Sequence, residues 1–206
     1  TKLKIGTGIA LLTQRDPIVT AKVVSSIDQL SNGRFLFGVG NGWNQDEIEN
    51  HGTVFESRHK LARERIEAMK AIWTQEQAAY HGDFVDFDPI FAWPKPVQKP
   101  HPPVIVGGAF PHGARRALEY GDGWMPIEFP GRLIRRIPDF WSAVDAAGRE
   151  RKSLELTIYG VAGDPATIES FTAAGASRVV FMLPPDPAPK LLPQLDRLAE
   201  LAQRLG

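Results

Sequence analysis

The stretch from Val104 to Trp124, VIVGGAFPHGARRALEYGDGW, constrains the fold more than any other part of the chain. It opens with a β-branched run at 104–106, typical of a strand that is buried on both faces. Gly107-Gly108 allows a sharp turn, and Pro111 suits the first position of the helix that the apolar spacing predicts next. Gly121 is expected to end that helix with a positive φ. The N–H groups at the helix start predict an anion site, with a plain strand-to-helix turn as the alternative.

The same alternation of strand and helix recurs along the whole chain of 206 residues. Strict alternation predicts a parallel sheet with helices outside it. A doubly wound sheet could stop at six strands, whereas a (β/α)8 barrel would need roughly 60 further residues at about 30 per unit. The start at Thr1, inside a strand-like run, makes an N-terminally incomplete barrel plausible. The six predicted strands cover residues 3–9, 34–39, 104–106, 123–127, 154–161 and 178–183.

Helix signals separate these strands. Asp16 is a good N-cap and Pro17 a good first helical residue, and the same pair of signals returns at Asp164 and Pro165. A long helix is expected over residues 57–73, and Pro138 should kink or divide a helix expected over 133–147. In the first helix, apolar spacing predicts a buried face made of Val19, Val23, Ile27 and Leu30.

Residues 78–103 are interpreted as an insertion in a single domain that covers residues 1–206. Residues 80–87 alternate around His81-Gly82-Asp83 and predict a small hairpin. The following segment, 88–103, holds six prolines in sixteen residues, so it is expected to run extended over the surface to the next core strand.

Composition excludes several classes of function. Lysine plus arginine equals aspartate plus glutamate at 24 each, which gives no support for nucleic acid or an anionic membrane as the partner. The chain has no cysteine, so disulfides, thiolate metal sites and cysteine nucleophiles are excluded. The five histidines lack metal-ligand spacing, and the carboxylates form no pair suited to acid–base catalysis. Without a membrane-length apolar run or a signal peptide, the expected location is the cytoplasm.

Four segments in order, LKIGTGIALLTQRDPIVTAK, LSNGRFLFGVGNGWNQDE, KPVQKPHPPVIVGG and YGDGW, together resemble the luciferase-like monooxygenase superfamily. Within it they are most similar to the coenzyme F420-dependent oxidoreductases, although FMN-dependent members share the framework. The resemblance implies an α/β fold, a (β/α)8 TIM barrel of the bacterial luciferase type. This chain would supply strands three to eight and would lack the first two βα units.

The resemblance also implies a cofactor site. Thr7, Gly8 and Ile9 would form a bulge, often with a non-prolyl cis peptide, that backs the cofactor ring. Asn41-Gly42 would contact the ring or its side chain, and Trp43 would line the substrate side or, alternatively, belong to the core. The phosphate turn would comprise Gly107, Gly108, Ala109 and Phe110, with a weaker contact from Met125, for which a core position is the alternative.

The implied function is hydride transfer between the deazaflavin F420 and a small organic substrate, by an expected homodimer whose chemistry resides in the cofactor. No catalytic side chain and no metal ligand are assigned. Two alternatives stay open. One is an FMN-dependent monooxygenase that works with a separate flavin reductase. The other is a truncated, non-catalytic flavin-binding paralogue.

Overall fold

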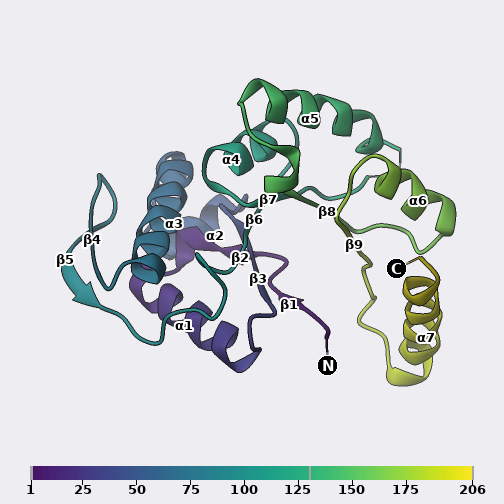
Figure 1. The fold of residues 1–206 in the computed structure, drawn as a ribbon, viewed down its shortest axis with the longest axis horizontal. Helices are drawn as coiled ribbons and strands as arrows, with labels where there is room; N and C mark the ends of the chain where they lie inside the picture. Colours follow the sequence, from purple (N-terminus) through teal and green to yellow (C-terminus); the bar gives the residue numbers. More distant parts are fainter. Residues whose placement is uncertain (1, 130, 206) are drawn as a thin grey trace. The chain divides into compact units, whose positions relative to one another are not determined.

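The computed structural model describes residues 2–129 and 131–205 and shows an α/β fold in which parallel strands alternate with helices (Figure 1). Two compact units are present. The first comprises the described residues up to Gly107 together with Arg116–Asp122. The second comprises Gly108–Arg115 and the described residues from Gly123 onward. Every predicted strand has a counterpart, so the predicted alternation is confirmed.

The sheet of the first unit is parallel and is organised around β3 (Phe35–Gly40). β1 (Ile5–Gly6) and β2 (Ala10–Leu11) both pair with β3, with Ile5 opposite Phe35 and Ala10 opposite Val39. On its other side β3 pairs with β6 (Val104–Gly107). All four residues of β6 are buried, as its β-branched run predicts. The strand expected over residues 3–9 is therefore divided, and the interruption falls at residues 7–9.

The helix α1 (Pro17–Leu30) begins where its N-cap predicts, because the backbone N–H of Val19 donates to Asp16 Oδ1 at 2.8 Å. The predicted apolar face, however, is wrong. Val19, Val23 and Leu30 are 61%, 50% and 89% exposed.

A different face of α1 is buried, and it carries Ala21, Val24 and Asp28. The indole N–H of Trp73 donates to the carbonyl of Ala21 at 3.0 Å, so the helix approaches its neighbour through a small residue. The Asp28 carboxylate accepts from the backbone and side-chain N–H groups of Gln98 at 2.9 and 2.7 Å. Hydropathy spacing cannot anticipate a buried carboxylate that is satisfied by a residue seventy positions away.

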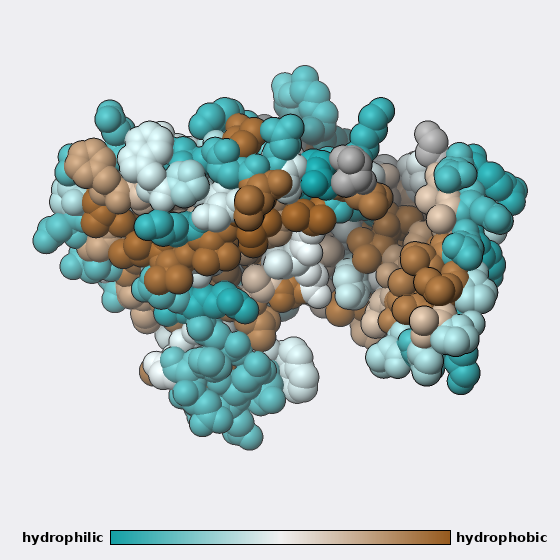
Figure 2. All heavy atoms as spheres, turned by 90° about the horizontal axis from the view of Figure 1, so that it is seen from below, coloured by the Kyte–Doolittle hydropathy of each residue, from teal (hydrophilic) through white to brown (hydrophobic). Residues whose placement is uncertain are grey.

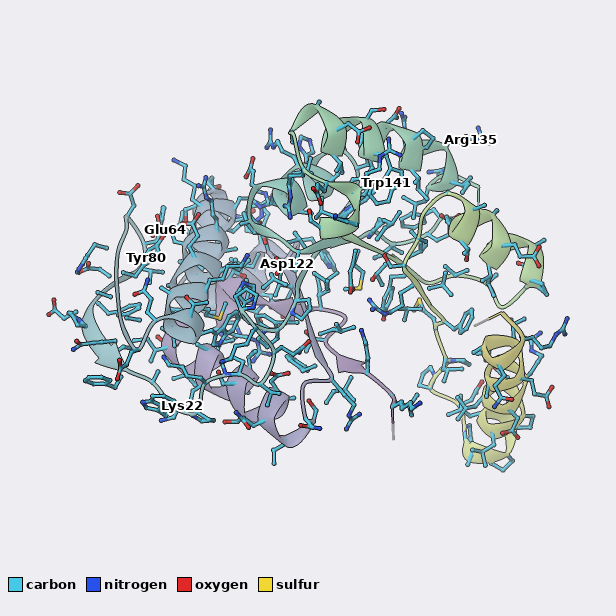
Figure 3. The ribbon with its side chains drawn as sticks, viewed as in Figure 1. Lys22, Glu64, Tyr80, Asp122, Arg135 and Trp141 are labelled. Carbon is cyan, nitrogen blue, oxygen red and sulfur yellow. The ribbon has the colours of Figure 1, made fainter. Side chains whose placement is uncertain are left out.

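The helix α3 (Arg58–Thr74) confirms the prediction for residues 57–73 and carries the hairpin formed by β4 (Gln77–His81) and β5 (Asp86–Phe91). Glu64 Oε2 accepts from the backbone N–H groups of Phe84 and Val85 at 2.7 and 3.0 Å. The Tyr80 hydroxyl donates to Glu67 at 2.7 Å, and Figure 3 shows Glu64 and Tyr80 beside each other. The hairpin is longer than predicted and includes Pro89, which a strand at a sheet edge tolerates. That residues 78–103 are an insertion stays a prediction.

The second unit has parallel pairing between β7 (Gly123–Met125) and β8 (Glu155–Tyr159), and between β8 and β9 (Arg178–Val180). Its helices are α5 (Ile137–Ala146), α6 (Pro165–Ala173) and α7 (Ala188–Leu205). A 3-10 turn at Ile134–Arg136 precedes α5, so Pro138 lies in a first helical turn and divides the predicted helix. Asp164 caps α6 through the N–H of Thr167 at 3.0 Å, as predicted.

Aromatic residues fill the core of the second unit. The ring centroid of Phe140 lies 4.8 Å from that of Trp124 and 4.7 Å from that of Trp141.

Other large apolar side chains are exposed, and Figure 2 shows apolar surface on the face it draws. Within residues 2–129 and 131–205, no helix combines the length and apolar character needed to cross a membrane. The most exposed of the large apolar side chains include Leu3, Leu30, Trp43, Phe91 and Met182.

Candidate cofactor site

The interruption between β1 and β2 places a loop of three residues against β3. The peptide bond between Gly8 and Ile9 is cis. The Thr7 hydroxyl donates to the carbonyl of Gly38 at 2.7 Å, which ties the loop to the neighbouring strand. That this loop backs a cofactor ring stays a prediction.

The side chain of Ile9 occupies the space above two strand ends. A Cβ added at Gly107 would lie 2.9 Å from Cδ1 of Ile9 and 3.3 Å from the carbonyl oxygen of Val39. A Cβ added at Gly40 would overlap the same Cδ1 atom. Glycine at the ends of β3 and β6 therefore makes room for Ile9, which is half-buried. The result is a small apolar surface at the carboxyl ends of parallel strands, where α/β enzymes place their ligands.

A buried polar cluster adjoins the end of β3. Asn41 is 8% exposed, and its amide nitrogen lies 2.7 Å from Nδ1 of His59. Since the amide N–H donates, His59 accepts through Nδ1 and carries its proton on Nε2. The Thr13 hydroxyl donates to the Asn41 carbonyl at 3.3 Å. Burial raises the pKa of Tyr120, and the nearby positive charge of Arg116 opposes that rise.

The loop after Asn41 is tight. Gly42 has φ +77°, and a Cβ there would lie 2.9 Å from Cδ1 of Ile48. Trp43 is 86% exposed, so the core alternative for this residue is wrong. The side chain of Asn44 caps the short helix α2 (Gln45–Asn50), whose first turn holds Asp46 and Glu47.

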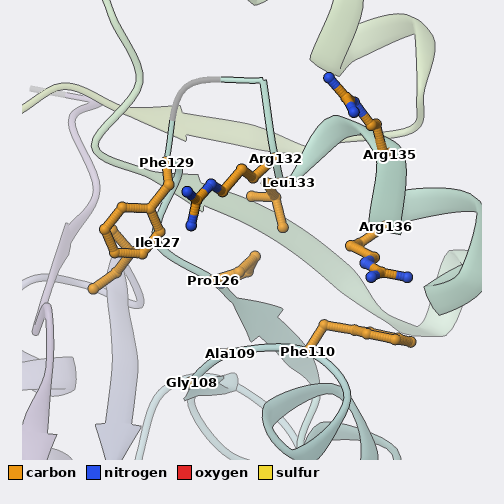
Figure 4. A pocket seen from close by; sticks show the side chains of 10 residues that line it. All are labelled: Gly108, Ala109, Phe110, Pro126, Ile127, Phe129, Arg132, Leu133, Arg135 and Arg136. Atoms are coloured by element: carbon orange, nitrogen blue, oxygen red, sulfur yellow. The ribbon is translucent and has the colours of Figure 1, made fainter.

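In the second unit, a pocket of about 720 Å³ opens at the turn that follows β6 (Figure 4). Gly108 has φ +121°, a conformation open to glycine and strained for other residues. The turn is braced from the core, because the Trp124 indole N–H donates to the carbonyl of Gly108 at 2.9 Å. α4 (His112–Tyr120) begins directly after the turn, and the N–H of Gly113 donates to the carbonyl of Ala109 at 2.7 Å.

The other walls of the pocket are apolar and cationic. Beside Gly108, Ala109 and Phe110 it is lined by Pro126, Ile127, Phe129, Arg132, Leu133, Arg135 and Arg136. The guanidinium of Arg136 lies 5.9 Å from the ring centroid of Phe110 and forms an exposed ion pair with Asp139 at 3.2 Å. No acidic residue lines the pocket in the described part of the chain. A small anion, such as a phosphate, matches this donor set.

Glu128 supports the segment that carries these arginines. Its Oε1 accepts from the N–H of Gly131 at 3.0 Å, while Oε2 is buried and has no hydrogen-bond partner among residues 2–129 and 131–205. Burial raises the pKa of this carboxyl group. The sequence did not point to Glu128, His59, Tyr120 or the arginines as residues of the candidate site. The signal for the arginines is their spacing at i, i+3 and i+4 directly after a predicted strand.

Two further predictions concern single residues. Met125 is 8% exposed at the end of β7, and its contact with the cofactor stays a prediction. Gly121 does not have the positive φ expected of it. A Cβ there would lie 2.8 Å from Cγ2 of Val106, so close packing accounts for this glycine. Among the described residues, no group of histidine, aspartate and glutamate side chains could hold a metal ion.

Comparison with known proteins decides the family. The family model for luciferase-like monooxygenases matches residues 1–169. The chain belongs to this family. An uncharacterised protein of Mycobacterium tuberculosis is 39% identical over 208 residues, which cover 96% of this chain and 70% of that protein.

Relatives of this luciferase-like chain divide between two cofactors. The FMNH2-dependent dimethylsulfone monooxygenase of Pseudomonas putida is 38% identical over 96 residues, 45% of this chain and 26% of that protein. The F420-dependent glucose-6-phosphate dehydrogenase of Amycolatopsis mediterranei is 29% identical over 164 residues, 76% of this chain and 49% of that protein.

Solved structures support the fold. An F420-dependent secondary alcohol dehydrogenase has a TM-score of 0.65 at 20% identity, covering 96% of this chain and 71% of its own. Monooxygenase RslO1 of Streptomyces bottropensis has a TM-score of 0.66 at 22% identity, and the chain spans 61% of its length. The closed eight-stranded barrel stays a prediction.

Proposed function

We propose that this protein is an F420-dependent oxidoreductase that transfers a hydride between the cofactor and a small organic substrate. The observation that carries the proposal is the apolar surface at Ile9, framed by Gly40 and Gly107, at the carboxyl ends of parallel strands. A flat tricyclic ring can rest on such a surface. When bound, F420 supplies a hydride carrier, so the protein needs to provide position and electrostatics and no nucleophile of its own.

The extent of similarity favours F420 over FMN. Two F420-dependent dehydrogenases align with this chain over 164 residues each, whereas the dimethylsulfone monooxygenase aligns over 96. This supports the deazaflavin as the cofactor.

The roles of the residues follow from their surroundings. Thr7, Gly8 and Ile9 would back the ring, and the buried amide of Asn41, oriented by His59, would donate or accept at its polar edge. The turn at 107–110 would hold the phosphate with backbone N–H groups. Trp43 is exposed after a tight turn and would contribute an apolar wall on the substrate side. Met125 would make a minor contact.

A second candidate is an FMN-dependent monooxygenase that receives reduced flavin from a separate reductase. The observation in its favour is the 38% identity to the dimethylsulfone monooxygenase, which is higher than the identity to either F420-dependent dehydrogenase. The homodimer implied by the resemblance belongs to both candidates and would be tested by sedimentation. The cytoplasmic location expected from the sequence also belongs to both and would be tested by fractionation.

Titration of the purified protein with F420 and, separately, with FMN tests the proposal by fluorescence. We expect micromolar binding of F420 and at least about tenfold weaker binding of FMN, a difference of about 1.4 kcal/mol. Tight binding of FMN alone would replace the proposal with the monooxygenase. Binding of neither would leave the non-catalytic paralogue.

A matched pair of variants tests the phosphate turn. Gly108→Ala strains a position with φ +121° and should weaken F420 binding about tenfold or more. Gly148→Ala strains a position with φ +68° in the same unit, where an added Cβ meets no atom within 4 Å. It should leave cofactor affinity unchanged. Equal affinities for the two variants would remove the turn from the proposed site.

A further inference from the structure

Exposed apolar side chains gather at the carboxyl ends of strands in the second unit. Ile127 and Phe129 follow β7, Met182 follows β9, and their side chains are 54%, 60% and 64% exposed. Single exposed apolar residues are ordinary on protein surfaces, whereas a group of them marks an interaction site. Because α/β enzymes bind small molecules at the carboxyl ends of parallel strands, this group is placed to contact such a molecule.

Gly160, which follows β8, leaves a slot between two of these side chains. It has φ +83°, a conformation that is strained for residues other than glycine. A Cβ added to Gly160 would lie 3.5 Å from Sδ of Met182 and 3.9 Å from Cγ2 of Ile127, which is ordinary van der Waals contact. The space above Gly160 is therefore open, and a methyl or methylene group of a ligand fits there between Ile127 and Met182.

The backbone around this slot is hydrogen-bonded within the protein. The N–H of Glu128 donates to the carbonyl of Tyr159 at 2.7 Å. The N–H groups of Gly160 and Val161 donate to the carbonyl of Val180 at 2.9 and 3.1 Å. These donors hold the strand ends together and are not available to a ligand. The many hydroxyl groups of a sugar would lose water here without gaining partners, which is unfavourable.

One polar side chain lies close to the same surface. In Figure 4 the ring of Phe129 lies beside Ile127, and Arg132 extends toward Phe129. Ile127 and Phe129 also line the pocket of about 720 Å³, a size that suits a small organic molecule. The guanidinium group of Arg132 can donate to an acceptor oxygen at the edge of the apolar side chains. The ligand that matches these surroundings is an apolar molecule with one acceptor oxygen.

We propose that Ile127, Phe129 and Met182, here called the strand-end surface, bind an alkyl or aryl group of the substrate. This inference rests on the proposed function and names the class of molecule that the oxidoreductase accepts. The substrate is a small apolar compound that carries an acceptor oxygen, and it is not a sugar phosphate. Methionine suits position 182, because its unbranched thioether side chain adapts to ligands of different shapes.

Nuclear magnetic resonance of methionine methyl groups tests the proposal without any measurement of activity. The chain contains three methionines, so labelling with ¹³C at the methyl groups should give three signals. Met182→Leu identifies the signal of Met182 by its loss. Met69 is 0% exposed within α3 and is the internal control.

Titration with straight-chain ketones from 2-butanone to 2-octanone should shift the signal of Met182 in a saturable manner and leave that of Met69 unchanged. Each added methylene group should tighten binding about twofold to fourfold, because it removes further apolar area from water. Glucose 6-phosphate at the same concentrations should not shift the signal of Met182.

A matched pair of variants keeps Met182 as the reporter. The variant that carries Ile127→Gln and Phe129→Gln should bind 2-octanone about tenfold more weakly and lose most of the dependence on chain length. Leu195→Gln replaces a side chain that is 45% exposed on α7 in the same unit, and it should bind 2-octanone as the unmodified protein does. Far-ultraviolet circular dichroism and the melting temperature would establish that both variants fold.

The outcomes separate this inference from the proposed function. Equal affinity for short and long ketones, or equal weakening in the two variants, overturns the strand-end surface and leaves the F420 titration unaffected. A Met182 signal that shifts with protein concentration in the absence of ligand also overturns it, because a second copy of the chain would then cover the surface. Ketone binding by a protein that binds neither F420 nor FMN would overturn the proposed function, and with it the assignment of this ligand as a substrate.

Discussion

At the scale of single residues, the phosphate turn depends on one hydrogen bond from the core. Trp124 is fully buried between Phe110 and Phe140, and its indole N–H meets the carbonyl of Gly108. A buried aromatic side chain with few rotamers is a rigid donor. It holds the carbonyl in place, and the carbonyl orients the backbone N–H groups that follow it.

Trp124→Phe should therefore destabilise the fold and weaken cofactor binding. The unpaired carbonyl of Gly108 would cost about 1–3 kcal/mol in the free energy of unfolding. Urea denaturation and an F420 titration measure the two effects.

Trp141→Phe is the matched control, because Trp141 also donates to a backbone carbonyl, that of Ala174 at 2.8 Å. This control should lose similar stability and keep its affinity for F420. A loss of affinity in both variants would show that the turn responds to stability in general and not to its own hydrogen bond.

Glu128 makes stability depend on pH. Burial raises its pKa in the folded state above the ordinary value of 4.5, so the folded protein holds its proton to a higher pH than the unfolded chain does. The free energy of unfolding should therefore fall as the pH rises from about 4.5 through the folded-state pKa.

Glu128→Gln removes this ionisation and keeps an oxygen for the N–H of Gly131. It should be more stable than the unmodified protein at neutral pH and no more stable at pH 4, as measured by chemical denaturation at both values. A variant less stable at neutral pH would mean that the ionised carboxylate contributes favourably.

At the scale of elements, start signals and packing faces differ in how well sequence predicts them. Asp16 and Asp164 act within three residues of themselves, and both caps are confirmed. The buried face of α1 depends instead on Trp73 and Gln98, which lie far along the chain. Hydropathy spacing alone selects the wrong face, because it counts Asp28 as a surface residue.

Adjacent valines of α1 test the corrected face. Val24 is 2% exposed and Val23 is 50% exposed. Val24→Ala should cost about 1–3 kcal/mol in the free energy of unfolding through lost burial and a cavity, and Val23→Ala less than about 0.5 kcal/mol. Urea midpoints measure both. The reverse order would restore the face predicted from the spacing of Val19, Val23 and Leu30.

The parts of the candidate site that are formed by backbone turns could be predicted from the sequence. Glycines at 8, 42, 107 and 108 mark close approaches and turns, and these signals are local in the sequence. The partner of the Asn41 side chain could not be predicted, because His59 reaches it from α3. Only the three-dimensional arrangement of strand ends and helix ends brings such side chains together.

At the scale of the whole molecule, a ligand that binds only the folded state raises the melting temperature. F420 at one hundred times its dissociation constant should add about 2.7 kcal/mol of stability. For a chain of 206 residues this corresponds to an increase of about 5–10 °C in melting temperature. Differential scanning fluorimetry measures it.

FMN at the same concentration, if it binds about tenfold more weakly, should add about 1.4 kcal/mol and raise the melting temperature by about 3–6 °C. Riboflavin, which lacks the phosphate, is the control and should have no effect. Equal increases with F420 and FMN would contradict the preference for the deazaflavin, and a larger increase with FMN would support the monooxygenase.

The seating of Ile9 over Gly40 and Gly107 has a consequence for how these positions vary. Alanine at either glycine would force Cδ1 of Ile9 to move, whereas Ile9→Ala removes the atom that the new methyl group would meet. The three positions should therefore behave as one evolutionary unit. Alanine at Gly40 or Gly107 alone should lower the stability of the fold, and Ile9→Ala should offset part of that loss. A double-mutant cycle should give a coupling energy of about 0.5–3 kcal/mol. If these residues back the cofactor ring as proposed, the shape of that surface depends on all three positions together.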